Sequence, residues 1–167
     1  MAYVFFSCLG CLVHNMCAVA QKDQLQKKSK EKNSSVSLDE SSLFDDNLGV
    51  KSSSLTYNGD GTWISNEGLV YGQGSQEGNR VKHVMTHKVP NLEKPVHTVF
   101  NVEKSEVINL IDEGWLKKGS CVMQGNGNVV YDIDMGRSIG TNGENVLGII
   151  TEGYTNNIVS SFPKGVN

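Results

Sequence analysis

Three short runs of strand-forming residues near the C-terminus constrain the fold of this 167-residue chain most strongly. They are NVVYDIDM (128–135), NVLGIIT (145–151) and NIVSSF (157–162), and the turn-rich segments GRSIGTNGE and EGYTNN separate them. β-Branched and aromatic residues favour strands, whereas clustered glycine and asparagine favour turns. The sequence therefore predicts an antiparallel meander at the end of the chain.

Two helices are predicted before this sheet. The first is a short helix over residues 79–88, which ends before Val89-Pro90 because the residue before a proline disfavours helical backbone. The second is capped by Asn101, is closed by residues 117–119, and carries an apolar face formed by Val107, Leu110, Ile111 and Trp115. Helices followed by a sheet predict an α+β class, with N-terminal helices packed on one face of an antiparallel β-sheet.

Further strand signals precede the first helix. SLTY and TWIS flank the turn residues 58–61, which predicts a β-hairpin, and LVY follows at residues 69–71. The segment HTVF (97–100) also reads as a short strand. A chain of this length holds one domain of ordinary size, so we predict a folded α+β domain over residues 54–167.

The first 53 residues differ in composition from this domain. Residues 1–20 contain no charged side chain, and an apolar run at 4–13 precedes the A-x-A pattern of Ala18-Val19-Ala20, which predicts a signal peptide and a secreted or periplasmic protein. A membrane anchor and an unprocessed start remain alternatives. Residues 21–53 are polar and predict a disordered linker, so no stable membrane domain is expected after processing.

The cysteines allow one further interpretation. Cys8, Cys11, His14 and Cys17 are ligand types that suit zinc, but their uniform spacing of three leaves no loop to fold around an ion. Cys121 stands apart from them and is expected to be a small buried residue. No metal or other cofactor is predicted.

Three of the four histidines, His83, His87 and His97, lie within fifteen residues. The full chain has a net charge of -3, which excludes bulk attraction to nucleic acid, yet the basic residues Arg80, Lys82, Lys88 and Lys94 surround these histidines. Phosphodiester cleavage needs one group to accept a proton, another to donate one, and cations to stabilise phosphoryl charge. The cluster therefore predicts acid/base chemistry on a phosphate.

Two other interpretations of the cluster remain open. His83 and His87 are four residues apart and would share a helical face as zinc ligands do, although Val84 stands where a zinc protease has its glutamate. The histidines could also form a solvated surface cluster without chemistry. The chain contains no phosphate-binding G-x-x-x-x-G-K-[ST] loop and no G-x-S-x-G nucleophile motif.

Several blocks of the sequence resemble the C-terminal toxin domains of bacterial contact-dependent growth inhibition and related polymorphic toxins. They are GSQEGNRVKHVMTHKVPNLEKPVHTVFNV, the helix end DEGW, VYDIDMGRSIGTNGE and the closing NIVSSFP, which together span roughly residues 72–165. Those domains resemble the small microbial ribonuclease fold of barnase, tRNA-cleaving colicins and RelE-like toxins. Such toxins normally terminate very large secreted proteins, whereas a short tether precedes the domain here.

The resemblance implies a metal-independent endoribonuclease that cleaves RNA in the cytoplasm of a target cell, with tRNA as the expected substrate and a cognate immunity protein as a partner. We expect His83 and His97 to be the acid/base pair, because they belong to different segments and could approach a phosphate from opposite sides, and His87, one helical turn from His83, is the substitute candidate. The remaining expected site residues are catalytic Arg80, Lys82, Thr98 and Ser160, and substrate-binding Lys88, Arg137 and Thr141. The alternative function is an exported, non-catalytic binding module for an anionic ligand or a partner protein.

Overall fold

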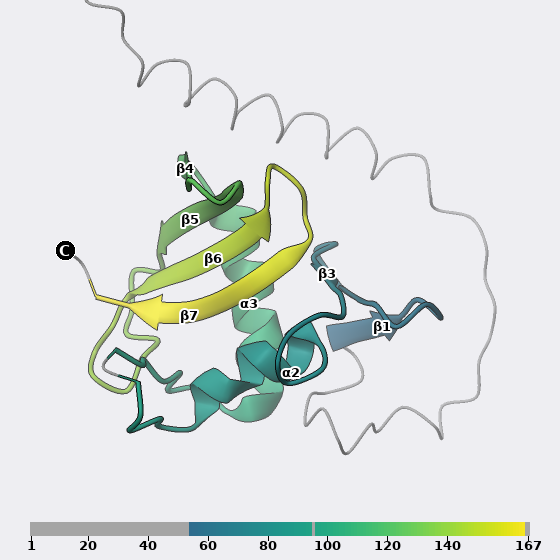
Figure 1. The fold of residues 1–167 in the computed structure, drawn as a ribbon. Coiled ribbons are helices and arrows are strands. Elements are labelled where there is room, and N and C mark those ends of the chain that lie inside the picture. Colours follow the sequence, from purple (N-terminus) through teal and green to yellow (C-terminus); the bar gives the residue numbers. More distant parts are fainter. Residues whose placement is uncertain (1–53, 95, 166–167) are drawn as a thin grey trace, which may run out of the picture.

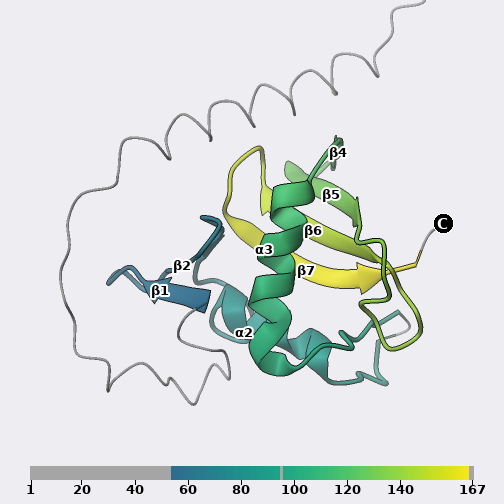
Figure 2. The ribbon, with the colours of Figure 1, turned by 180° about the vertical axis from the view of Figure 1, so that it is seen from behind.

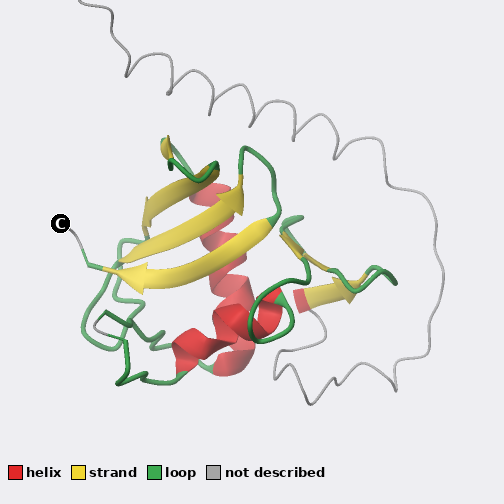
Figure 3. Ribbon diagram, viewed as in Figure 1, coloured by secondary structure: helices red, strands yellow, loops and turns green. Residues whose placement is uncertain are grey.

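The computed structural model describes residues 54–94 and 96–165. Within these ranges the chain forms two antiparallel sheets and two α-helices, which establishes the α+β class (Figures 1 and 3). The predicted signal peptide and linker lie outside the described residues. No helix in the described part is both long and apolar enough to cross a membrane.

The smaller sheet is three-stranded, with the order β1-β2-β3. Strands β1 (Leu55–Tyr57) and β2 (Trp63–Ser65) form the predicted hairpin, and β3 (Val70–Tyr71) continues it. The turn is fixed by Asp60, whose carboxylate accepts a hydrogen bond of 3.0 Å from the backbone N–H of Thr62. The hairpin prediction is therefore confirmed.

The larger sheet contains four strands in sequence order: β4 (Cys121–Met123), β5 (Asn128–Asp134), β6 (Val146–Glu152) and β7 (Ile158–Lys164). All its neighbouring strands pair antiparallel, so the predicted meander of the last three strands is confirmed. The sequence did not predict β4, a short edge strand with exposed Val122. Cys121 is buried at its start.

Helix α2 (Arg80–Met85) and the 3₁₀ turn Thr86–Lys88 occupy the first predicted helical segment. The side chain of Asn79 caps the helix, since its Oδ1 accepts a hydrogen bond of 2.9 Å from the backbone N–H of Lys82. The helix therefore begins next to residue 79, the predicted start of the helical segment. The final turn is tighter than predicted.

Two local predictions were wrong. Helix α3 (Val107–Lys117) begins six residues after Asn101, and a 3₁₀ turn (Lys104–Glu106) precedes it. The Asn101 side chain donates instead to the backbone carbonyl and hydroxyl of Ser138. Residues 97–100 do not form a strand, because the only ladder contact recorded there among the described residues is one bridge between Phe100 and Gly140.

The buried apolar side chains of α3 belong to one hydrophobic cluster with residues of β5 and β6. Trp115 meets Tyr131 edge to face with 5.3 Å between ring centroids, and Figure 2, which views the molecule from behind, shows α3 crossing in front of the larger sheet. Gly114 permits a close approach, since a Cβ atom there would lie 2.4 Å from Leu147 Cδ2. The four apolar α3 residues that the sequence singled out are all buried.

Strand β7 is the element that brings the candidate site together. Helix α2 packs against β7, and β3 meets the turn before β7 through a 2.9 Å hydrogen bond from Val70 N–H to the Asn156 carbonyl. Figure 1 shows α2 beside β7, the outer strand of the larger sheet. The seam between α2 and β7 therefore brings residues of the first helical segment next to residues of the last strand.

Candidate functional site

A cavity of about 550 Å³ lies at the C-terminal end of this seam. Its walls come from α2 and the following turn, from the segment after Pro95, and from the end of β7. It is lined by His83, His87, Lys94, Val96, His97, Thr98, Ser160, Phe162, Pro163, Lys164 and Gly165. The three clustered histidines therefore share one open space.

His83 is held by a carboxylate. Its Nδ1 lies 3.0 Å from Glu77 Oε2, and both side chains are partly exposed. Burial works to raise the pKa of Glu77, but hydrogen bonds from His83 and from the backbone hold that pKa below its usual value. Because an ionised carboxylate only accepts hydrogen bonds, Nδ1 of His83 carries the proton and Nε2 is left able to accept one.

His87 and His97 stack on each other with 4.7 Å between centroids and an interplanar angle of 12°. Nδ1 of His87 donates to the Thr98 carbonyl at 3.0 Å, and Nε2 of His97 donates to the Val89 carbonyl at 2.9 Å. Phe162 packs on the His87 ring, at 5.5 Å between centroids. These contacts fix both rings and leave one nitrogen of each for other partners.

The pKa of His87 lies below its usual value, chiefly because burial disfavours the charged ring and also because His97 and His83 lie nearby. His87 is therefore neutral near pH 7. His83 makes an edge-to-face contact with the same ring, at 6.5 Å between centroids. A neutral ring thus lies in contact with both of the histidines that the sequence predicted as acid and base.

The lowered pKa of His87 predicts a pH-dependent loss of stability. In the unfolded chain this ring binds a proton near its ordinary pKa of about 6.5, whereas the folded state resists that proton. The free energy of unfolding should therefore fall as the pH drops from 7.5 to 5.5. Urea unfolding of the wild type and His87→Gln at both pH values measures this, and the variant should lose less stability than the wild type; an equal loss in both proteins would contradict it.

Two hydroxyl groups that the sequence placed among the candidate site residues line the cavity, but their hydrogen bonds differ. The Thr98 hydroxyl donates to the Pro163 carbonyl, so its proton is already used. Ser160 is 8% exposed, and no hydrogen bond to its hydroxyl is found within residues 54–94 and 96–165. The Ser160 hydroxyl can therefore donate a hydrogen bond to a bound anion. The Thr98 hydroxyl can only accept one, and its bond to Pro163 joins the segment after Pro95 to the end of β7.

The cations of the cavity are Lys94 and Lys164, which the sequence did not single out as site residues. Lys164 Nζ lies 2.8 Å from Asp132 Oδ2 on β5, which is separated from β7 by β6. Lys94 lies three residues before His97, a proximity visible in the sequence, but Lys164 joins the cavity only through the pairing of β7. Glu77 was also missed, although it lies only six residues before His83, because the local turn at Gly78 that brings the two side chains together was not predicted.

The other predicted site residues lie elsewhere in the structure. Arg80 lines a second cavity, and Lys82 is exposed without lining either one. Lys88 Nζ donates to the backbone carbonyls of Phe100 and Val102, so it holds the loop before α3 in place and does not face the cavity. These three residues do not share the space between the histidines.

Arg137 and Thr141 are also outside the histidine cavity. Arg137 makes two hydrogen bonds to Glu113 on α3, at 2.7 and 2.5 Å, and these bonds lower the pKa of Glu113 to about 2. Thr141 is exposed, and its backbone N–H donates to the Val99 carbonyl. The glycine-rich turn that carries both residues is therefore fixed to α3 and to the 97–100 segment.

Metal binding was one of the two other interpretations of the histidines. In the described part of the chain, no three His, Cys, Asp or Glu side chains are grouped as metal ligands. Each of the three histidines has one ring nitrogen hydrogen-bonded to a carbonyl or carboxylate oxygen.

Comparison with known proteins adds no relationship, because no family model, curated protein or solved structure is similar enough to the chain to count as a match.

Proposed function

We propose that the chain is a metal-independent endoribonuclease of toxin type, in which the histidine cavity binds the scissile phosphate. The observation that carries the proposal is the grouping of three histidines around one cavity, with Glu77 holding Nδ1 of His83. A histidine oriented by a carboxylate is suited to take a proton, because the carboxylate stabilises the imidazolium that forms. The distance of 3.0 Å between the two atoms supports this role.

His83 acts as the general base in this proposal. Nε2 of His83 takes the proton of the ribose 2′-hydroxyl, and the 2′-oxygen attacks the adjacent phosphorus. The bond from phosphorus to the 5′-oxygen breaks, and protonated His97 supplies a proton from Nδ1 to that leaving oxygen. The products are a 2′,3′-cyclic phosphate and a 5′-hydroxyl, and solvent then restores the protonation states of both histidines.

Charge on the phosphoryl oxygens is stabilised by Lys94, with a hydrogen bond from Ser160. Lys164 adds positive potential at the rim, although its ion pair with Asp132 reduces that contribution. His87 stays neutral and keeps the other two rings apart, since it contacts both of them. Arg80 and Lys82, which we expected from the sequence to do this, do not line the histidine cavity.

The toxin assignment rests on the resemblance of residues 72–165 to polymorphic toxin domains. In that fold N-terminal helices cover one face of the antiparallel sheet, and the contacts of Trp115 with Tyr131 and of Gly114 with Leu147 support the same layering here. We accordingly propose tRNA as the substrate class and a cognate immunity protein as the partner. Export through the N-terminal segment and action in a target-cell cytoplasm belong to the same proposal.

The purified chain incubated with total tRNA is expected to cleave RNA in the presence of EDTA. Attack by the 2′-hydroxyl predicts fragments with 2′,3′-cyclic phosphate and 5′-hydroxyl ends, which mass spectrometry identifies. The matched control is an oligonucleotide with a single 2′-deoxy substitution at the cut position, which should stay intact because its nucleophile is missing.

Each alternative predicts a different result in the same assay. Cleavage that EDTA abolishes would support a metal site. Binding of RNA without cleavage at micromolar protein would favour the exported binding module. Cleavage of the 2′-deoxy oligonucleotide would contradict the proposed mechanism.

A further inference from the structure

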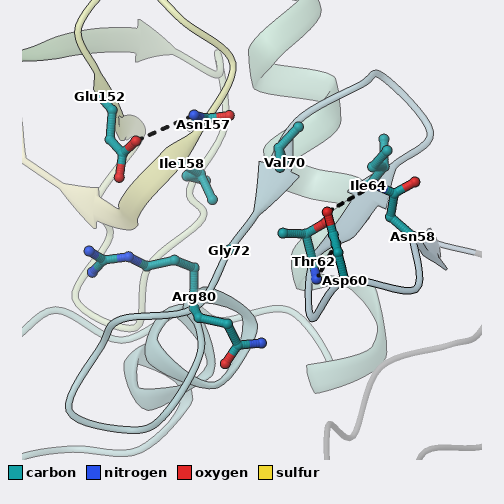
Figure 4. Close-up of a pocket in the computed structure, with 11 residues that line it drawn as sticks. Asn58, Asp60, Thr62, Ile64, Val70, Gly72, Arg80, Glu152, Asn157 and Ile158 are labelled. Atoms are coloured by element: carbon teal, nitrogen blue, oxygen red, sulfur yellow. Dashed lines mark hydrogen bonds between the residues drawn. The ribbon is translucent and has the colours of Figure 1, made fainter.

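A second cavity of about 280 Å³ lies at the other end of the seam between α2 and β7. The β1–β2 hairpin, β3 and the turn between β6 and β7 surround it, and Arg80 of α2 projects along its floor (Figure 4). It is lined by Asn58, Asp60, Thr62, Ile64, Val70, Gly72, Gln73, Arg80, Glu152, Asn157 and Ile158. The proposed ribonuclease chemistry uses none of these residues.

The two cavities follow each other along the same two elements. On α2 and its continuation, Arg80 lines the second cavity while His83 and His87 line the first, at spacings of three and four residues that share a helical face. On β7, Ile158 lines the second cavity and Ser160 the first. Alternate strand residues point to the same side and are about 7 Å apart, which is comparable with the length of one nucleotide in an unstacked RNA strand.

Two features of the second cavity disfavour a phosphate. Asp60 and Glu152 both line it, and their negative charges would repel a phosphoryl group. Three apolar side chains, Ile64, Val70 and Ile158, also face it and suit the flat faces of an aromatic ring. The cavity therefore matches a nucleobase better than a backbone group, because bases of unstacked RNA are recognised on their edges and faces.

The polar groups select among the bases. Arg80 Nη1 donates to the Val159 carbonyl at 3.3 Å, which leaves other guanidinium N–H groups for carbonyl and ring-nitrogen acceptors. Glu152 Oε2 accepts from Asn157 Nδ2 at 3.3 Å, and a carboxylate can accept further N–H donors. Guanine is the base that presents both the O6 and N7 acceptors that arginine favours and N–H donors for a carboxylate.

We propose that the second cavity is a guanine subsite that holds the base of a nucleotide next to the cleaved bond. This inference rests on the proposed ribonuclease function for its position beside a scissile phosphate. The base recognition itself depends only on the second cavity, so it can be measured without cleavage.

The binding test uses the full chain and guanosine 3′- and 5′-monophosphates, with the adenosine monophosphates as the comparison. Amide signals of Gly72 and Asn157 are followed by NMR during the titration. We expect at least one guanosine monophosphate to bind about 10-fold or more tightly than its adenosine counterpart, the discrimination of a good bidentate contact. Glu152→Gln should abolish the difference, because the carboxamide replaces one acceptor with a donor, whereas the exposed Glu103→Gln should retain it.

The position of the subsite relative to the cleaved bond is then tested with a set of single-stranded oligonucleotides, each of which carries one guanine at a different position. Preferred cleavage beside the guanine, lost in Glu152→Gln, supports the subsite. Equal binding of guanosine and adenosine nucleotides, or a preference that Glu152→Gln does not change, overturns it even where RNA is still cut. Guanine-selective binding without any RNA cleavage supports the base site and refutes the ribonuclease function instead.

Discussion

Replacing His83 with alanine is expected to lower the rate of RNA cleavage about 10²- to 10⁴-fold, the usual share of general acid or base catalysis. The ring is partly exposed, and its side chain is hydrogen-bonded to the partly exposed Glu77, so the fold should tolerate the change. His97→Ala should cause a loss of similar size, because it removes the proton donor to the leaving oxygen. Cleavage rates at saturating RNA, with circular dichroism and urea unfolding for each variant, measure both effects.

The matched control is Lys104→Ala, which removes an exposed residue that does not line the cavity. It should cut RNA at the wild-type rate. Full activity in both histidine variants would leave the proposed mechanism without its acid and base. If His87→Gln lost as much activity as His83→Ala, the proton transfer would have to be assigned to His87 instead.

Glu77 is a positioning residue in this scheme, since it holds His83 and does not line the cavity. That distinction can be tested by comparing two variants of Glu77. Glu77→Ala should therefore lower the maximal rate of cleavage at every pH, and Glu77→Gln, whose amide oxygen can still accept the hydrogen bond from Nδ1 of His83, should restore part of that rate, whereas a merely structural role would change stability and leave the rate of the folded protein unchanged.

The regular elements could be predicted because their signals are local. The strand runs of β5, β6 and β7 combine β-branched residues with glycine- and asparagine-rich turns, and these preferences need no tertiary partner. The short helix α2 could be predicted for the same reason, because the helical segment ends before Val89-Pro90. Strand β4 was missed because three residues before a glycine turn carry too little pattern.

The start of α3 shows where local reasoning fails. Asn101 is a good capping residue by type, but its side chain is engaged by Ser138 from a distant turn. The helix instead begins after a 3₁₀ turn, where Val107 enters the core. Tertiary contacts thus outweighed a capping preference of about 1 kcal/mol.

The same contrast applies to the candidate site. Closeness in sequence was enough to group His83, His87 and His97, because a helix and its following loop keep them on one side. Charge alone could not tell which cations join them. Arg137 pairs with α3, and Lys88 binds backbone carbonyls, while Lys164 reaches the cavity through strand pairing. Partners of basic side chains depend on the topology, which the sequence pattern does not encode locally.

Replacing Trp115 with alanine is expected to lower the free energy of unfolding by about 3 to 5 kcal/mol, the range observed for large aromatic residues in protein cores. The side chain is 4% exposed and meets Tyr131 edge to face. The Lys118 ammonium lies 4.0 Å from its ring centroid and adds a cation–π contact. Domains are marginally stable at about 5 to 15 kcal/mol, so a loss of this size leaves a substantial unfolded population or abolishes folding.

Leu116→Ala is the matched control, because Leu116 is the next residue of the same helix and its side chain is 67% exposed. Both substitutions keep a good helix former in the chain, so helix propensity does not separate them. Urea unfolding should show a shift of at most about 0.5 kcal/mol for Leu116→Ala, as is usual for exposed positions. Similar losses in the two variants would mean that α3 is rotated and that its buried face is not the one carrying Trp115.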